Sequence, residues 1–221
     1  MVMRLPRLMF LLLVCALATE LAAKPVVVQI KVGAPKIEYQ TFPVGHPPMH
    51  AKGLAGEAGL CQTEIACQVG VEGEAPRISL GEARATLHTV SFTISVRITI
   101  WCQEGYTQMI LDHEETHRAI SEHYYAMAYK VARRLADEAI ARKLSLAGKP
   151  RAEALDRALK ELQTRLLDEF MSETNQRCEF AQDRFDAITD HGRNAITNAD
   201  AMAQALREEA EHWKKADPSK L

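Results

Sequence analysis

The sequence predicts an α+β protein in which a small antiparallel β-sheet forms the N-terminal part and long helices form the rest. Two observations support this division. Gly, Pro and β-branched residues are concentrated in residues 24–104, where one long segment alternates between apolar and polar side chains. Residues 105–200 are instead dominated by helix-forming residues, with apolar side chains at helical spacing. Residues 201–221 are expected to form a C-terminal helix and tail.

The first 23 residues have the three-part design of a secretory signal peptide. Arg4 and Arg7 supply a basic start, residues 8–17 form an apolar run, and small residues follow up to Ala23. A membrane-spanning helix needs about 20 apolar residues, so this run is too short to be an anchor. We therefore expect cleavage of residues 1–23, a secreted or periplasmic protein, and no membrane span after cleavage.

The cysteines fit an oxidising compartment. Cys15 lies in the signal segment and leaves with it, so four cysteines remain in the mature chain. An even number of cysteines in an exported protein suggests disulfides, here two, and three connectivities are open. The short spacing between Cys61 and Cys67 favours a small closed loop, which pairs Cys102 with Cys178 by elimination.

The β-rich part contains three segments with strand character. Residues 26–32 and 36–42 read as strands, and residues 43–59 are rich in Pro, Gly and His and read as a loop. The clearest strand is residues 89–101, in which apolar and polar side chains alternate without a fault. One face of this strand should pack on a core, and the other should face water or a cleft.

The helical part is expected to contain three helices separated by two breaks. The first helix runs from about residue 107 to 146, and residues 147–150, with the sequence Ala-Gly-Lys-Pro, interrupt it. The second runs from about residue 152 to the late 180s. Residues 191–193 supply the next break, because glycine commonly terminates helices. The last helix covers about residues 195–215.

A motif on the first of these helices, His113-Glu114-Glu115-Thr116-His117, has the His-Glu-x-x-His spacing of zinc metallopeptidases. Helix residues i and i+4 lie one turn apart, so both imidazoles can bind one ion. Glu114 lies close enough to take a proton from a metal-bound water. Both histidines fall on the apolar stripe of the helix, where burying them without a metal or partners would be costly. The motif therefore predicts Zn²⁺ bound by His113 and His117, with Glu114 as general base.

Two residues at familiar ligand spacings are excluded by the continuous helix. His123 has the metzincin spacing, but metzincins place a glycine where this chain has Ile120. Without that turn, His123 points about 120° away from His117 and lies roughly 9 Å further along the helix. Glu138 has a gluzincin-like spacing but lies on the same helix. The third ligand must come from another segment, for which the second long helix is the natural source.

A second motif occupies residues 183–192, with the sequence Asp-Arg-Phe-Asp-Ala-Ile-Thr-Asp-His-Gly. It resembles the Tyr-Asp-x-x-Thr-x-His-Gly signature of a family of predicted secreted bacterial zinc-dependent proteases, catalogued as a domain of unknown function. In that family a small β-rich part, a His-Glu-x-x-His helix and a C-terminal helix with the signature occur in this order, and the likeness here spans about residues 26–200. Phe185 replaces the tyrosine, so this chain has no hydroxyl at that position, while the residues expected to bind the metal are unaffected. The resemblance implies a zincin-like helical part.

The resemblance implies that His191 is the third zinc ligand, with Asp186 and Thr189 as supporting residues. If the two long helices form a hairpin, His191 lies roughly 12 Å beyond the segment that faces the first motif. A kink or break near residues 172–176 can absorb that distance. Otherwise Asp183 or Asp186 becomes the better ligand and gives a site of two histidines and one carboxylate.

These features predict a zinc metallopeptidase that hydrolyses peptide bonds in a peptide or protein substrate. The net charge of −2, with mixed signs, gives no electrostatic basis for nucleic-acid binding. A peptide can pair with a sheet edge, and residues 89–101 qualify only if they form that edge. Two alternatives stay open: a non-catalytic envelope protein with a structural metal site, and a zinc amidase that acts on cell-wall amides. A closed site with four ligands and no metal-bound water would favour the structural role.

Overall fold

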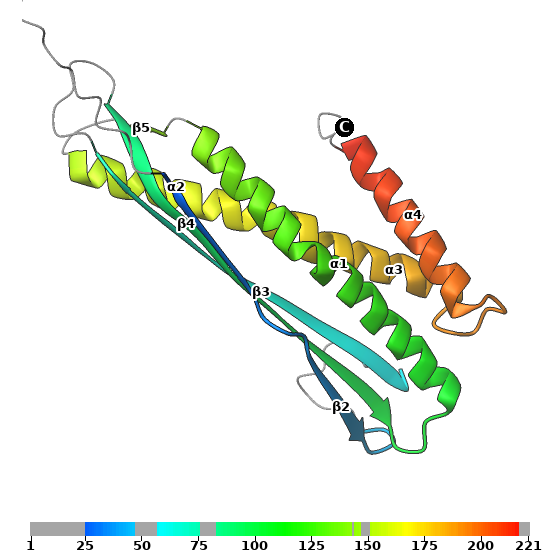
Figure 1. The fold of residues 1–221 in the computed structure, drawn as a ribbon. Helices are drawn as coiled ribbons and strands as arrows, with labels where there is room; N and C mark the ends of the chain where they lie inside the picture. Colours follow the sequence, from blue (N-terminus) through cyan, green and yellow to red (C-terminus); the bar gives the residue numbers. More distant parts are fainter. Residues whose placement is uncertain (1–24, 47–56, 76–82, 143, 147–150, 217–221) are drawn as a thin grey trace, which may run out of the picture.

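The structure is a computed structural model that describes residues 25–46, 57–75, 83–142, 144–146 and 151–216. The expected signal peptide and most of the expected loop lie outside these residues. Figure 1 shows an elongated molecule in which a long, twisted sheet lies against helices on one face. In the part of the chain that the structure describes, no helix is both long and apolar enough to cross a membrane.

The strands form one mixed sheet: β1 (Val27–Val32), β2 (Lys36–Phe42), β3 (Gly59–Glu74), β4 (Ala83–Gln103) and β5 (Leu144–Leu146). β4 is central, with β1 and β2 parallel to it along one edge and β3 antiparallel along the other. β5 pairs antiparallel with the start of β4. The α+β class is therefore confirmed, but the expectation of an antiparallel sheet is wrong. Because the chain reverses into β3 and again into β4, β4 returns to the direction of β1 and β2.

The strand expected at residues 89–101 lies within β4, and its alternation is confirmed. Its even-numbered side chains are buried against the helices, whereas Thr93, Ser95 and Arg97 on the other face are exposed. β4 has strands paired on both sides along most of this segment. It is therefore the centre of the sheet and not the edge that substrate pairing would require.

β3 is the strand that the sequence interpretation missed. Its odd-numbered positions are mostly apolar and its even-numbered positions are often polar, so a period of two is present in residues 61–72. Small residues weaken the pattern. Cys61 and Cys67 stand where large β-branched residues would mark the apolar face, and Ala66 and Gly70 stand where polar residues would mark the other face.

The expected disulfides are not formed, because all four described cysteines are free thiols. Cys61 and Cys67 lie on the same strand, β3. Six residues of strand separate their Cα atoms by about 20 Å, far beyond the Cα separation of about 4.4–6.8 Å in a disulfide. Cys178 instead contacts the Ser121 hydroxyl, with 3.9 Å between sulfur and oxygen. The predicted pairings Cys61–Cys67 and Cys102–Cys178 are therefore corrected.

The helical elements are α1 (Gln108–Ala141), α2 (Arg151–Met171), the π-helical turn η1 (Ser172–Gln176), α3 (Arg177–Thr189) and α4 (Asn198–Ala216). The three expected helices are present with two differences. The first ends at Ala141, and residues 144–146 form β5 instead. The second is divided by η1, which falls in the segment where a kink was expected to bring the second motif toward the first.

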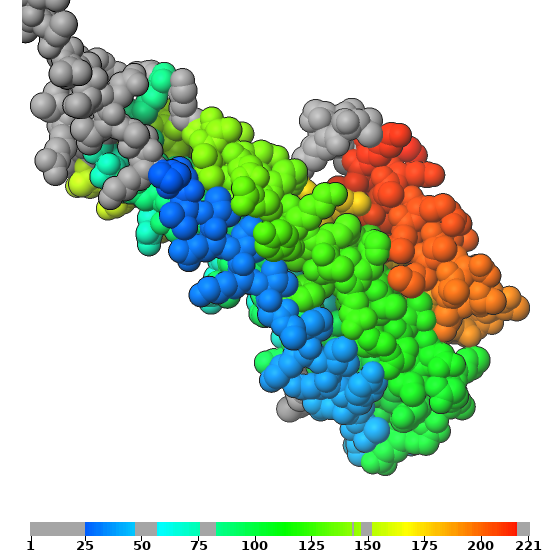
Figure 2. Space-filling model, viewed as in Figure 1, coloured from blue at the N-terminus to red at the C-terminus, as the bar shows by residue number. Residues whose placement is uncertain are grey.

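Two apolar cores hold the helices in place. The larger lies between the sheet and α1 and α2, and includes Phe92, Ile98 and Phe170. The smaller lies between α1, α3 and α4, and includes Tyr124 and Phe185. On the surface in Figure 2, β1 and β2 lie along one side of α1, and α4 lies along the other. This architecture gives no support to the expected zincin-like fold. It packs α3 against α1, which brings the two sequence motifs together.

Candidate metal centre

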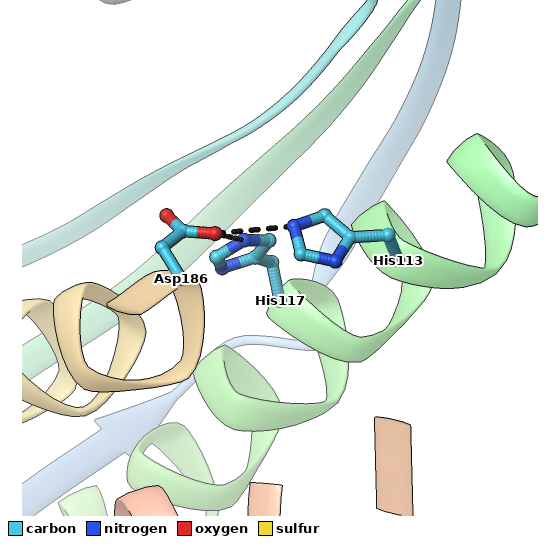
Figure 3. A group of neighbouring side chains, drawn as sticks. All are labelled: His113, His117 and Asp186. Carbon is cyan, nitrogen blue, oxygen red and sulfur yellow. Dashed lines mark hydrogen bonds and ion pairs between the residues drawn. The ribbon is translucent and has the colours of Figure 1, made fainter. Parts of the chain in front are cut away.

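A tight connection after β4 places the start of α1 beside the start of β3. The Gln103 N–H donates to the Ala58 carbonyl at 2.8 Å, and Gly105 turns the chain with a φ of 75° before α1 begins. His113 and His117 then lie one helical turn apart and are only 8% and 6% exposed. Figure 3 shows both imidazole rings turned toward α3. The first motif is thus buried on one face of α1.

Asp186 on α3 brings the two histidines together. Its Oδ1 atom lies 3.1 Å from His113 Nε2 and 2.9 Å from His117 Nε2 (Figure 3). The ligand atoms of these three residues all lie within 4.8 Å of one another, so the group has the composition and spacing of a metal site. Burial acts to raise the pKa of Asp186, but hydrogen bonds from the two imidazoles outweigh it and hold the pKa below its usual range. The carboxylate is therefore ionised and suited to a divalent cation.

Phe185 sets the orientation of both rings. It is fully buried, stacks on His113 with a centroid distance of 4.8 Å, and meets His117 edge-on at 5.0 Å. Neither Nδ1 atom has a hydrogen-bond partner among the described residues. Two kinds of contact thus orient the imidazoles: the packing of Phe185 against both rings, and the Asp186 oxygen at both Nε2 atoms. Neither contact needs a hydroxyl at position 185.

Glu114 is held against the start of β3. The Cys61 backbone N–H donates a hydrogen bond to its carboxylate. A Cβ atom on Gly59 would lie only 2.6 Å from Glu114 Oε1, so the glycine permits this close approach. Burial, followed by the nearby charges of Asp186 and Glu57, raises the pKa of Glu114 to about 8. A buried carboxyl group with a raised pKa beside two imidazoles has the properties of a general acid or base.

His191 lies beside the three-residue group and is not part of it. Its Nδ1 atom is 3.8 Å from Asp186 Oδ1 and 3.4 Å from Glu57 Oε1, and its side chain is 47% exposed. The turn that carries it has positive φ angles of 50° at Asp190, 52° at His191 and 82° at Gly192. Two successive residues other than glycine in this region are uncommon, and such strain concentrates at functional sites.

The other sequence candidates are placed as follows. Asp183 lies one turn before Asp186 on α3, and burial together with the Asp186 charge raises its pKa, but it does not join the three-residue group. Thr189 donates hydrogen bonds to the backbone of Phe185 and Asp186 and so supports the end of α3. His123 is exposed, in agreement with its exclusion as a ligand.

The start of β3 and the segment just before it supply the site residues that sequence reasoning missed. Glu57, Gly59 and Cys61 line a hollow of about 260 Å³ together with the three-residue group and Glu114. The alternation in residues 61–72 is the only signal in the sequence that predicts a strand here. The hollow leaves space beside the cluster, so the arrangement is open on one side rather than closed by a fourth residue of the described part.

Comparison of the chain with protein-family models, with curated proteins and with solved structures finds no match. The resemblance of residues 183–192 to the family signature therefore stays a prediction.

Proposed function

We propose that this protein is a zinc-dependent peptidase in which His113, His117 and Asp186 bind the metal and Glu114 is the general base. The observation that carries the proposal is the convergence of two buried imidazoles on one carboxylate oxygen, at 3.1 and 2.9 Å, beside an open hollow that also contains Glu114. We place the reaction outside the cytoplasm because residues 1–23 have the composition of a signal peptide.

The three donors fit a zinc ion. Catalytic zinc sites commonly have three protein ligands, including combinations of two histidines and a carboxylate, and keep a fourth position for water. Ligands bonded at about 2.0–2.1 Å in a tetrahedral arrangement lie roughly 3.3 Å apart. The two His–Asp separations of 3.1 and 2.9 Å lie close to that value, and all three ligand atoms lie within 4.8 Å of one another.

The roles of the chain's own residues follow from their positions. A bound zinc ion would polarise the scissile carbonyl and acidify a water molecule. Glu114 accepts the proton from that water on its carboxylate and returns it to the nitrogen of the leaving amine. The hydrogen bond from the Cys61 N–H keeps the Glu114 carboxylate at the edge of the hollow, and Phe185 keeps both imidazoles aimed into it.

The open hollow favours a catalytic metal site over a structural one. A structural metal site is normally closed by four protein ligands, whereas the group here has three residues and adjoining space. A zinc amidase acting on cell-wall amides would use the same chemistry, so substrate preference separates it from a peptidase.

The test replaces the base and keeps the ligands. Glu114→Gln should retain zinc, measured by elemental analysis, and lose hydrolysis of an unstructured protein such as casein by at least about 100-fold. Glu115→Gln is the matched control, because Glu115 lies outside the hollow and bonds to Tyr39 and Arg118 instead. Unchanged hydrolysis in Glu114→Gln would exclude Glu114 as the base, and absence of zinc from the wild-type protein would exclude the metal site.

A further inference from the structure

The outer edge of β3 is free of strand partners in the part of the chain that the structure describes, since β3 pairs with β4 alone. The direction of its backbone groups follows from three contacts. The Cys61 N–H donates to Glu114, and the Val69 carbonyl accepts from Gln163 Nε2 at 2.7 Å, so both point away from β4. The Ala58 carbonyl, in contrast, accepts from the Gln103 N–H at the end of β4.

These contacts assign the whole first half of the strand. In an antiparallel pair, alternate residues direct both their N–H and C=O to the partner strand, and the residues between them direct both away. The odd-numbered residues of β3 therefore face the free edge. Near the metal centre these are Gly59, Cys61 and Thr63, and the Cys61 N–H is already bound to Glu114. Among the described residues, the Cys61 carbonyl and both backbone groups of Thr63 have no backbone partner on this edge.

A groove runs along this free edge on both sides of the metal centre. Toward Thr63, a hollow of about 210 Å³ lies between β3 and the α3 residues Cys178 and Gln182. The central hollow holds the three-residue group, and it shares Cys61 and Gln182 with the first. Toward the beginning of β3, a smaller hollow of about 90 Å³ shares Gly59 and His191 with the central one. The proposed ligands thus lie in the middle of the groove and not at one end.

The spacing of the backbone groups on the free edge matches one class of ligand, an extended polypeptide. Outward groups of a strand recur every second residue, or about every 7 Å, and an extended polypeptide backbone has the same repeat. Sugar chains and compact ligands do not. A groove that continues past the metal centre in both directions has room for chain on each side of a scissile bond, so neither end of the substrate needs to lie at the site.

We propose that the substrate is an internal segment of an extended polypeptide, bound as an added strand to the β3 edge at Gly59–Thr63, so that the protein is an endopeptidase for unfolded or flexible chain. This inference rests on the proposed function. The same strand edge then holds both the substrate, through the backbone of Thr63, and the base, through the N–H of Cys61.

The test uses an unstructured peptide of about ten residues with both termini blocked, in the zinc-loaded full-length protein. The blocked peptide should be cleaved at an internal bond as fast as the unblocked one. N-methylation of single backbone amides should lower kcat/KM by about five- to tenfold at alternate positions and leave the positions between them nearly unaffected, since each loss removes one hydrogen bond. Cleavage that needs a free terminus, or N-methyl effects without alternation, would overturn the inference.

A pair of variants tests the strand itself. Thr63→Pro removes the outward N–H without breaking a bond to β4, and Thr63→Val gives the baseline for loss of the hydroxyl, which contacts Ser121 at 2.6 Å. The peptide affinity and the kcat/KM of Thr63→Pro should both be about five- to tenfold lower than those of Thr63→Val. Equal activity of the two would contradict the strand pairing.

Binding to Glu114→Gln separates this inference from the proposed function. Alternating N-methyl effects on binding, with no hydrolysis by the wild-type protein, would support the strand edge and reject the peptidase. Hydrolysis without alternation would support the peptidase and reject the strand edge.

Discussion

Gly59→Ala tests whether the position of Glu114 against β3 matters for catalysis. The added Cβ would lie 2.6 Å from Glu114 Oε1 and 2.9 Å from both Glu114 Cγ and Ile110 Cγ2. Ordinary carbon contacts lie at about 3.5–4.0 Å, so the carboxylate or the start of β3 must move by roughly 1 Å. Gly59 lies in an extended strand, a backbone conformation that alanine adopts readily. The substitution therefore adds a steric clash and no backbone strain.

The expected effect falls on turnover. A displacement of about 1 Å at a catalytic group can cost about 100-fold in rate, and we expect a loss of this size in kcat. The clash should also destabilise the fold by about 1–3 kcal/mol, as overpacking does in a buried site. The metal should stay bound, because the three atoms we assign as ligands belong to other residues.

Gly33→Ala is the matched control, because among the described residues a Cβ there would meet only the Ile94 carbonyl, at an ordinary 3.6 Å. Steady-state hydrolysis of a quenched peptide, zinc content and thermal unfolding would be measured for both variants and the wild type. Gly33→Ala should match the wild type in all three. A Gly59→Ala protein with wild-type kcat would refute the reasoning, and so would one that has lost its zinc, because the damage would then lie in the ligand set.

Three further predictions concern the ligands, the α3–α4 contact and pH. Asp186→Ala should weaken zinc binding more than about 100-fold while His191→Ala retains the metal after dialysis, and equal loss in both would contradict the assignment. Arg177→Met should lower the free energy of unfolding in urea by about 3–5 kcal/mol, because it leaves Glu209, 2% exposed, without its ion-pair partner. Arg177→Met combined with Glu209→Met should recover most of that loss, and a loss below about 1 kcal/mol in the single variant would contradict the role. Burial raises the pKa of the Cys102 thiol from 9.0 to about 11, so the folded state favours the protonated form. Its contribution to stability should be complete below about pH 9 and lost as the pH rises toward 11, and the urea midpoint of Cys102→Ala should fall less steeply over this range than that of the wild type.

The part of the site that could be predicted from sequence is the part carried by one element. His113, Glu114 and His117 belong to a single amphipathic helix, so their relative positions follow from about 3.6 residues per turn alone. The exclusion of His123 rests on the same periodicity and agrees with its exposure. Likewise, the alternation in residues 89–101 is a local property, and it predicts a strand whatever its neighbours are.

The third candidate ligand depends on the relation between two elements, which local periodicity does not contain. Asp186 and His191 both follow η1, where a π-helical turn changes the rotation of α3 relative to α2. Counting residues at the α-helical rise from the end of α1 therefore mispositions the face of α3 that meets α1. The positive φ angles at Asp190 and His191 then turn His191 away from the helical path. Sequence reasoning left Asp183 and Asp186 open as alternatives because His191 falls roughly 12 Å beyond the segment that faces the first motif when an unbroken helix is assumed.

The position of β3 links the base and the substrate through one piece of backbone. The Cys61 N–H holds Glu114, and the adjacent outward groups of Thr63 are those we assign to the substrate. A shift of β3 should therefore change both kcat and KM, because it moves the base and the bound chain together. A change confined to Asp186 should act on the metal and on the pKa of Glu114 but leave the bound chain in place, since Asp186 belongs to α3 and makes no hydrogen bond to β3 in the described part. Separate responses of KM and zinc affinity to changes in these two elements would thus distinguish a substrate-binding strand from a strand that only covers the metal centre.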